Sequence, residues 1–273
     1  MKITVLAENT SASEALGSEH GLSVLIQTKS AAILFDTGCG GLFLKNAKKL
    51  GLDIRQVTHL ILSHGHYDHG GGIPAFLAEN KQASVFLRKE AFTPLYAKRL
   101  GGEIDDIGLP GELKDDPRLV FTHDGMVVTE KVTLFSDIRL SEPIPHTNQN
   151  LMKKENGQLV PDDFPHEQVA EFREDGKTLL VTGCSHHGIV NILKDYEEKT
   201  GRIPDVVIGG FHLHSHTHGR AEDKVIDSIA GYLAKTSARY YTCHCTGVPA
   251  YEELRKRLGK QIEYISGGQT ITL

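Results

Sequence analysis

The sequence that decides the fold is Ser63-His64-Gly65-His66-Tyr67-Asp68-His69-Gly70-Gly71-Gly72. It follows VTHLILS (57–63), a short run of apolar and β-branched residues that is typical of a buried strand. Three imidazoles and one carboxylate therefore lie close together where a strand ends. The glycines permit the positive-φ conformations that fold such a loop back on itself. Because imidazole is the commonest protein ligand of metals, the pattern favours a metal site over a solvated surface loop.

The spacing divides the side chains of this loop between two metal ions. We expect His64 and His66 to face the first ion, and Asp68 and His69 to face the second. The expected ions are two divalent transition metals, with zinc as the first choice and manganese or iron as alternatives. Two metals about 3.5–4 Å apart share a water molecule and lower its pKa from about 15.7 towards about 7. Asp68 is then also a candidate catalytic residue, because it would orient the resulting hydroxide.

The composition of the chain excludes several classes of protein. The chain has 273 residues, of which 39% are hydrophobic and 24% charged, and no apolar run approaches the roughly 20 residues that span a bilayer. Thirty basic and thirty-five acidic side chains leave a net charge of −5, which argues against a nucleic-acid partner. Four cysteines are too few for a disulfide framework. We therefore expect a small-molecule substrate and no membrane partner, with the oligomeric state left open.

The first residues, MKITVLAENT, enter an alternating apolar pattern directly. They lack the basic and apolar regions of a signal peptide. We therefore expect the protein to be cytoplasmic, with its cysteines in the reduced state.

Strands and helices follow one another in a similar order in the two halves of the chain. Each half begins with short β-rich runs and continues with alternating strands and helices. This order predicts a single α/β domain, a four-layer αββα sandwich in which two sheets pack face to face under outer helices. The segments 101–117 and 143–166 lack a clear period and are predicted to be long, substrate-facing loop insertions. KEAFTPLYAKRL (89–100) is predicted to be a helix that Pro94 interrupts.

The histidine loop and several later motifs resemble one known family. The chain is similar to the metallo-β-lactamase superfamily over essentially its whole length, and that resemblance implies the same αββα fold. At a finer level it resembles the subgroup labelled 7,8-dihydropterin-6-methyl-4-(β-D-ribofuranosyl)aminobenzene 5′-phosphate synthase-like, or simply metal-dependent hydrolase. The motifs that carry the resemblance are LFDTG (34–38), HGHYDHGGG (64–72), GCSHHGIVNI (183–192), IGGFHL (208–213) and CHCTG (243–247).

The resemblance implies further ligands, but the sequence departs from the superfamily pattern at one of them. An aspartate that bridges both metals is expected after the strand TLLVTG, and Cys184 stands there instead. A thiolate suits zinc or iron, so Cys184 is a candidate ligand, although a small buried packing residue is an equally good interpretation. His186 is the preferred third histidine of the first site. His146 and His166 are its rivals.

His244 follows the strand RYYTC and is the expected last ligand of the second metal site. Side chains alternate along a strand, so if His244 faces the metal, the flanking Cys243 and Cys245 face away from it. We therefore predict that both thiols are packed in the interior. By the same alternation, His187 points away from the site that His186 faces.

Histidine recurs at every second position from 212 to 218. If this stretch is extended, all four rings project from one side and form a binding rim, the alternative being a solvated loop. His212 follows the strand DVVIGG (205–210) directly and is a candidate catalytic residue that contacts the substrate. Asp36 is predicted to accept the Nδ1–H of a metal-bound histidine or, alternatively, to cap the next helix.

No motif for another kind of catalysis competes with the histidine loop, since the chain has neither a G-x-S-x-G elbow nor a P-loop. The sequence therefore predicts a hydrolase that uses a metal-bound hydroxide on a small-molecule ester, in the first place a phosphoester. Two alternatives stay open. One is a synthase that condenses a dihydropterin with an aminobenzene ribosyl phosphate, as the subgroup label implies. The other is a non-catalytic, metal-containing sensor or ligand-binding protein.

Overall fold

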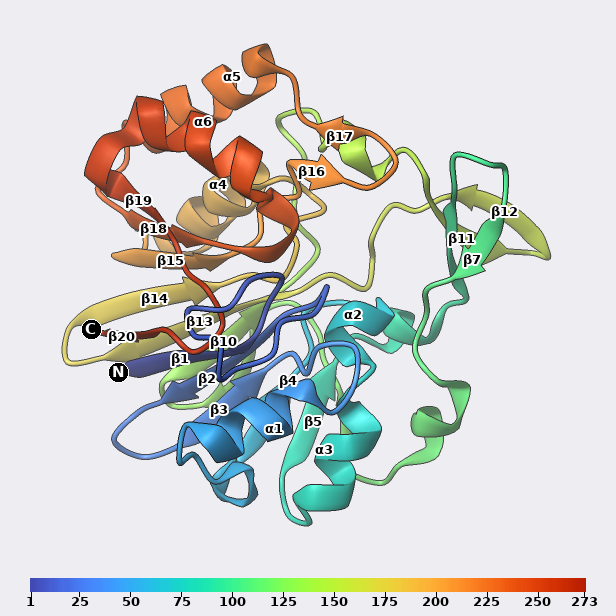
Figure 1. The fold of residues 1–273 in the computed structure, drawn as a ribbon, viewed down its shortest axis with the longest axis vertical. Coiled ribbons are helices and arrows are strands. Elements are labelled where there is room, and N and C mark those ends of the chain that lie inside the picture. Colours follow the sequence, from blue (N-terminus) through green and yellow to red (C-terminus); the bar gives the residue numbers. More distant parts are fainter.

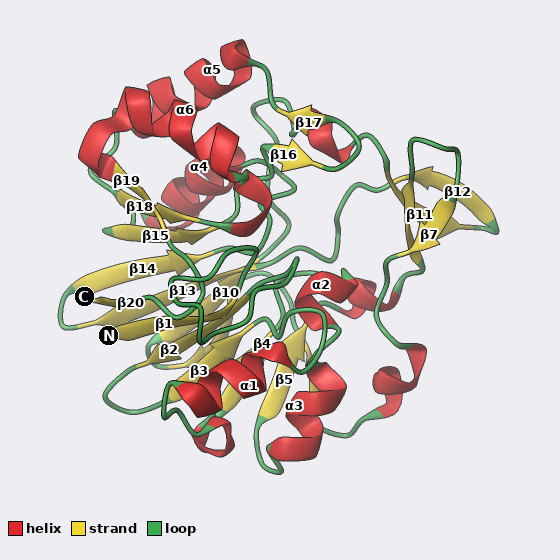
Figure 2. Ribbon diagram, viewed as in Figure 1, coloured by secondary structure: helices red, strands yellow, loops and turns green.

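Two seven-stranded sheets pack face to face, with helices on both outer sides (Figures 1 and 2). The computed structural model describes all residues from 1 to 273. Helices α1 (Leu42–Lys49) and α3 (Ile73–Glu79) cover the outer face of the first sheet. Helices α4 (Ile189–Thr200), α5 (Asp223–Leu233) and α6 (Val248–Leu258) cover the second. The predicted αββα architecture is confirmed.

Both sheets mix antiparallel strands with a parallel region. In spatial order, the first sheet contains β20 (Thr270–Thr272), β1 (Lys2–Ala7), β2 (Ser23–Gln27), β3 (Ala32–Phe35), β4 (His59–Ile61), β5 (Ser84–Leu87) and β8 (Leu119–Phe121). The second contains β19 (Ile262–Tyr264), β18 (Arg239–Thr242), β15 (Val206–Gly209), β14 (Lys177–Val181), β13 (Val169–Glu174), β10 (Val132–Phe135) and β9 (Met126–Thr129).

The apolar residues form three layers that hold this sandwich together. In β2, Val24 and Ile26 belong to the core between the two sheets, whereas Leu25 belongs to the core under α1 and α3. A third core fills the space between the second sheet and helices α4 to α6. Because the central strands are buried on both faces, their sequences are almost continuously apolar. Removal of this apolar surface from water is the main contribution to stability.

The segment 89–100 differs from its prediction as a broken helix. It forms a 3₁₀ turn over Lys89–Phe92 and then strand β6 (Leu95–Lys98). Pro94 prevents a continuous helix, and β6 pairs with strand β11 (Leu151–Glu155), which is far away in sequence. Pairing with β11 therefore outweighed the local helix propensity of this segment.

The two predicted loop insertions are also partly wrong. Segment 101–117 contains strand β7 (Ile104–Asp106), and segment 143–166 contains β11 and β12 (Gln158–Pro161). These strands join β6 in a separate four-stranded sheet, which projects beside the main sandwich in Figure 1. Strands β7 and β12 are short and largely exposed, so they carry no clear hydrophobic period.

The longest helix, α4, has 12 residues, and none of the helices has both the length and the apolar character of a membrane span.

Candidate metal centre

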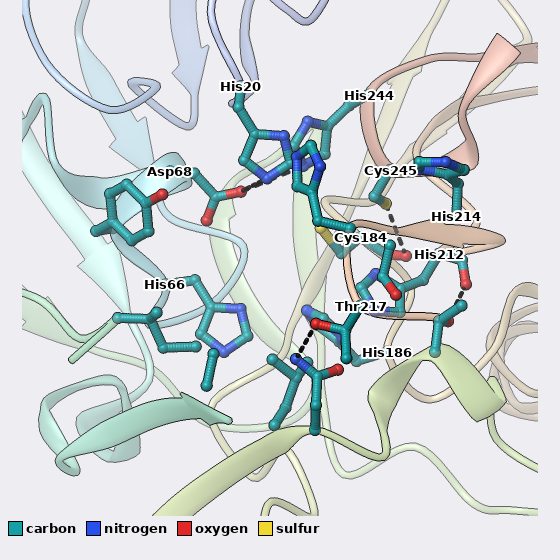
Figure 3. A pocket seen from close by; sticks show the side chains of 18 of the residues that line it. His20, His66, Asp68, Cys184, His186, His212, His214, Thr217, His244 and Cys245 are labelled. Atoms are coloured by element: carbon teal, nitrogen blue, oxygen red, sulfur yellow. Dashed lines mark hydrogen bonds and ion pairs between the residues drawn. The ribbon is translucent and has the colours of Figure 1, made fainter. Parts of the chain in front are cut away.

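The carboxyl ends of strands from both sheets meet at one edge of the sandwich. The loop after β4 contains the four predicted ligands, and its short helix α2 (Tyr67–Gly70) begins within them. Strands β14, β15 and β18 are mutually parallel, so the loops that follow them reach the same edge. Figure 3 shows the resulting pocket, in which side chains from all four loops point toward one another. Open α/β sheets bind ligands at such an edge.

The first group of candidate ligands consists of His64, His66 and His186. One ligand atom from each lies within 4.8 Å of the others, and all three side chains are buried. Burial lowers the pKa of His66 to about 3, so this ring is neutral at physiological pH. Its Nε2 atom is buried and has no hydrogen-bond partner. A buried ring nitrogen without a partner is unfavourable unless a ligand or cation completes the site.

The proton positions on His64 and His186 show what this group is suited to bind. Ser63 Oγ donates to Asp36 Oδ2 at 2.7 Å and must therefore accept from His64 Nδ1, 2.8 Å away. Asn148 Nδ2 donates to the His186 carbonyl, so Asn148 Oδ1 accepts from His186 Nδ1 at 2.9 Å. Each neutral ring has only one N–H, and both Nε2 atoms consequently carry lone pairs.

These two lone pairs face each other directly. The Nε2 atoms of His64 and His186 are 3.3 Å apart. Burial, followed by the neighbouring imidazoles, lowers the pKa of both rings well below its ordinary value. No proton is therefore available to bridge the two nitrogens. The arrangement is repulsive by itself, and it fits a divalent metal that accepts both lone pairs.

The second group consists of Asp68, His69 and His244. His69 Nε2 and His244 Nε2 are 3.1 Å apart, and Asp68 Oδ2 lies 3.7 Å from the first and 3.4 Å from the second. Burial alone would raise the pKa of Asp68, but the two histidines lower it below its usual range. Burial likewise opposes a charge on His69, yet Asp68 and Asp36 raise its pKa to about 9. This position therefore stabilises positive charge, and its donor set also fits a divalent metal.

Cys184 lies between the two groups. Its Sγ is 3.2 Å from His69 Nε2 and within 4.8 Å of a ring nitrogen of His64. Burial raises the pKa of this thiol well above its ordinary value, so its ionisation requires an adjacent cation. The side chain is thus buried, as the packing interpretation required, and it also occupies the position of a bridging ligand.

The structure distinguishes between His186 and its rivals. His166 accepts from Gly65 N–H at Nδ1 and pairs with Asp162 through Nε2 at 3.0 Å, so both of its ring nitrogens are used. His146 lies in a 3₁₀ turn and lines a different cavity. Only His186 is directed at His64 and His66.

The loop that carries His186 is held by Glu167, which the sequence analysis missed. Glu167 accepts from the backbone N–H groups of His186 at 2.6 Å and His187 at 2.9 Å. It also bonds the His187 ring at 2.6 Å, and this contact directs that ring away from the metal ligands as predicted. No local pattern marks Glu167, because its partners follow a different strand.

The prediction that both cysteines beside His244 face away from the metal ligands is wrong for Cys245, although both thiols are buried. Cys243 is part of the core between the sheets, but Cys245 lines the pocket (Figure 3). The alternation fails because His244 has φ 49° and begins a 3₁₀ turn. The strand therefore ends before Cys245, and strand periodicity no longer applies to it.

The four histidines from 212 to 218 do not form a common binding rim. His212 has φ 48°, which ends the extended run, and strands β16 (His214–Ser215) and β17 (Gly219–Arg220) then form a small hairpin. His214 and His216 line the pocket, whereas the ring of His218 lies against that of His146. His212 itself is 8% exposed, and neither of its ring nitrogens has a hydrogen-bond partner.

A further residue of the site, His20, was missed because an isolated histidine in the loop after β1 gives no signal. Its Nε2 is 3.3 Å from Asp68 Oδ2. Asn9 Oδ1 accepts from His244 Nδ1 at 2.7 Å, so the Asn9 amide nitrogen donates to His20 Nδ1. A neutral His20 therefore carries its proton on Nε2 and donates to Asp68. This tautomer distinguishes His20 from the rings that present lone pairs.

Asp36 makes the bond that was predicted for it. Its Oδ2 accepts from His69 Nδ1 at 2.7 Å, and its Oδ1 accepts from the Ser63 N–H at 2.7 Å. It does not cap helix α1, whose N-cap Gly41 has no side-chain cap. The carboxylate therefore orients His69 so that its Nε2 faces His244 and Cys184.

Asp36→Asn should lower metal affinity by about 10- to 100-fold, because outer partners of ligating histidines typically contribute that much. The amide of asparagine lacks the negative charge that stabilises His69. Its NH2 group can also donate to His69 Nδ1 and so favour the tautomer with the proton on Nε2. Competition with a chromophoric chelator would measure the change. Asp175→Asn, at an exposed turn with φ 51°, is the matched control and should leave affinity unchanged. An equal affinity for Asp36→Asn and the control would contradict the role of Asp36.

The fold and the site together define a class: an αββα protein whose strand ends bring histidines, a carboxylate and a thiol together around a candidate dinuclear metal centre. A family model described as the metallo-beta-lactamase superfamily matches residues 16–225, and the chain belongs to this superfamily. That assignment agrees with the resemblance seen in the motifs.

Particular relatives were also found. The chain is 30% identical to an uncharacterized protein of Methanocaldococcus jannaschii, with 92% of this chain and 93% of the relative covered. It is 29% identical to the 7,8-dihydropterin-6-methyl-4-(beta-D-ribofuranosyl)-aminobenzene-5'-phosphate synthase of the same organism, with 99% and 96% covered. A similar fold is found in the crystal structure of Tm1679, a metal-dependent hydrolase of the beta-lactamase superfamily, with a TM-score of 0.85. The two sequences are 31% identical, and the match covers 100% of this chain and 99% of Tm1679.

Proposed function

We propose that this protein is a dinuclear metal-dependent hydrolase that acts on a small-molecule ester, in the first place a phosphoester. The observation that carries the proposal is the pair of buried Nε2 lone pairs on His64 and His186, 3.3 Å apart with no proton to share. Such a pair is stable when a metal accepts both electron pairs. The similarity to Tm1679, which is described as a metal-dependent hydrolase, supports the same activity.

The residues present would hold two ions. His64, His66 and His186 would hold one, and Asp68, His69 and His244 the other, with Cys184 between them. When bound, such ions activate a water molecule as the nucleophile and stabilise developing negative charge as Lewis acids. No serine or other protein nucleophile is then required.

The other polar groups of the pocket position the reactants. His20 donates to Asp68 and thereby holds that carboxylate in one orientation. His212 lines the pocket, and both of its ring nitrogens are buried and unpaired, so its ring would have to turn toward the pocket to donate a hydrogen bond to a substrate oxygen. The pocket volume of about 210 Å³ suits a small molecule rather than a polymer.

A second candidate function is the condensation of a dihydropterin with an aminobenzene ribosyl phosphate. It is favoured by the relative whose name states that synthase activity, which matches 99% of this chain. The same pocket and ligands would serve either reaction. A non-catalytic sensor is disfavoured, because the candidate ligands are complete and the pocket beside them is open.

The discriminating experiment begins with metal analysis of the purified protein. The metal-loaded protein is then screened against phosphomonoesters, phosphodiesters and carboxylic esters, and separately incubated with the two synthase substrates. We expect close to two transition-metal ions per chain and turnover of at least one phosphoester. Formation of the joined pterin product without ester hydrolysis would favour the synthase instead. A metal-free protein whose activity resists chelators would contradict both.

A further inference from the structure

The outer part of the pocket has an uneven distribution of charge. One of its walls comes from the small sheet around β6, and another from the β16–β17 hairpin. Asp68 is the single carboxylate among the lining residues, and it belongs to the candidate metal site. Arg99 is the single lining residue with a permanent positive charge. Arg99 is therefore the one fixed cation that a substrate anion would meet in the pocket, and Asp105, which pairs with its Nε, is not among the lining residues.

Arg99 is held in a way that leaves its guanidinium free to bind a ligand. It directly follows β6, and its backbone N–H donates to the Glu103 carbonyl at 2.8 Å. Its Nε donates to Asp105 Oδ2 at 2.6 Å, which fixes the plane of the group. The two terminal nitrogens have no hydrogen-bond partner. Paired donors in one plane match the oxygens of a carboxylate or phosphate.

Asn150 provides a second, independent indication of a ligand at the same wall. Its backbone carbonyl accepts from Lys98 N–H at 2.8 Å, so it lies beside the end of β6. The residue is only 8% exposed and lines the pocket, but its Oδ1 has no hydrogen-bond partner. Its amide nitrogen reaches Thr217 on the opposite hairpin at 3.4 Å. A buried acceptor of this kind is stabilised when a ligand donates to it.

We propose that Arg99 and Asn150 form a substrate subsite for an anionic group with a neighbouring hydroxyl or N–H donor. The substrate class is a small ester that carries a negative charge separate from the ester group itself. Arg99 would bind the anion, and Asn150 Oδ1 would accept from the donor. This subsite rests on the proposed function, because it assumes that the ester group of the same substrate binds at the metal ligands.

Ligand binding tests the subsite without relying on turnover. The zinc-loaded protein is titrated calorimetrically with ethylphosphonate and with 3-phosphonopropionate, which adds only a distal carboxylate. The wild-type protein should bind the carboxylated ligand about tenfold more tightly or better, as expected for a charge-assisted, paired hydrogen bond. In Arg99→Gln this preference should disappear while the affinity for ethylphosphonate stays the same. Lys98→Gln, which removes the exposed cation next to Arg99 at the end of β6, is the control and should retain the preference.

A third ligand, 2-hydroxy-3-phosphonopropionate, tests the Asn150 contact. Its hydroxyl should improve binding by about two- to tenfold over 3-phosphonopropionate, and Asn150→Ala should abolish that gain. Equal binding of the carboxylated and plain ligands by the wild-type protein would overturn the Arg99 subsite, as would no measurable binding of either. A hydroxyl without effect would overturn the Asn150 contact. If the ester screen fails but the Arg99-dependent preference is present, the hydrolase proposal falls and the subsite stands.

Discussion

His66→Ala should leave the protein with at least one metal ion fewer per chain, out of close to two, and should lower ester hydrolysis by about 100-fold or more. Removing a residue that only hydrogen-bonds a metal ligand already lowers metal affinity or activity by roughly 10- to 100-fold. Removing a ligand itself should lower activity by at least the upper value. His66 Nε2 is buried and has no hydrogen-bond partner, so it has no other interaction to which the effect could be attributed.

His166 and His186 cannot replace His66 as a ligand. The ring centroids of His66 and His166 are 5.4 Å apart. Both ring nitrogens of His166 are already used, one by Asp162 and the other by the backbone N–H of Gly65. His186 already faces His64 and is held by Asn148. The first site would therefore keep two ligands and lose most of its affinity.

Metal analysis and thermal unfolding should be measured together on this variant. Alanine removes a buried ring, so a lower unfolding temperature in the presence of metal is expected. His123→Ala, which removes an exposed histidine, is the matched control and should keep both ions and full activity. Two tightly bound ions in folded His66→Ala would contradict the metal assignment.

Cys184→Ser should change which metal the protein retains. A thiolate is a soft ligand that favours zinc, whereas a hydroxyl is a weak and hard one. We therefore expect the zinc affinity to fall by at least about 10-fold. Cys184→Asp introduces the bridging carboxylate that the superfamily pattern leads one to expect, and it should bind two ions again, with a larger share of manganese.

The measurement is the metal content of each variant after loading from an equimolar mixture of zinc and manganese. Cys243→Ala is the control, because that thiol lies in the core between the sheets and should not affect metal content. If Cys184→Ser retained zinc as the wild type does, Cys184 would be a packing residue. Its distance of 3.2 Å from His69 Nε2 would then reflect close packing alone.

Much of the fold could be predicted from local patterns. Hairpins such as β2–β3 and β13–β14 were recognisable because short apolar runs flank turn residues. The small sheet was missed because β6 acquires its strand conformation by pairing with β11. That pairing joins distant segments, and neither segment has a period of its own.

The loop from His64 to His69 could be recognised because its ligands are close in sequence and follow a buried strand. Cys184 and His186 follow a later strand and could be singled out through the resemblance to the superfamily pattern. The histidine loop depends only on residue type and spacing, which is why sequence analysis reaches it. Asp36, which accepts from His69 Nδ1, could be singled out in the motif LFDTG (34–38).

The tertiary structure alone decided which nitrogen of each ring is free, because that depends on partners remote in sequence. Ser63 and Asn148 direct the lone pairs of His64 and His186 to each other, whereas Asp162 removes His166 from the site. The positive φ of His244 turned Cys245 into the pocket, and folding brought His20 to Asp68. The residue types in the sequence therefore indicated the kind of site. Hydrogen bonds that form only on folding decided which residues belong to it.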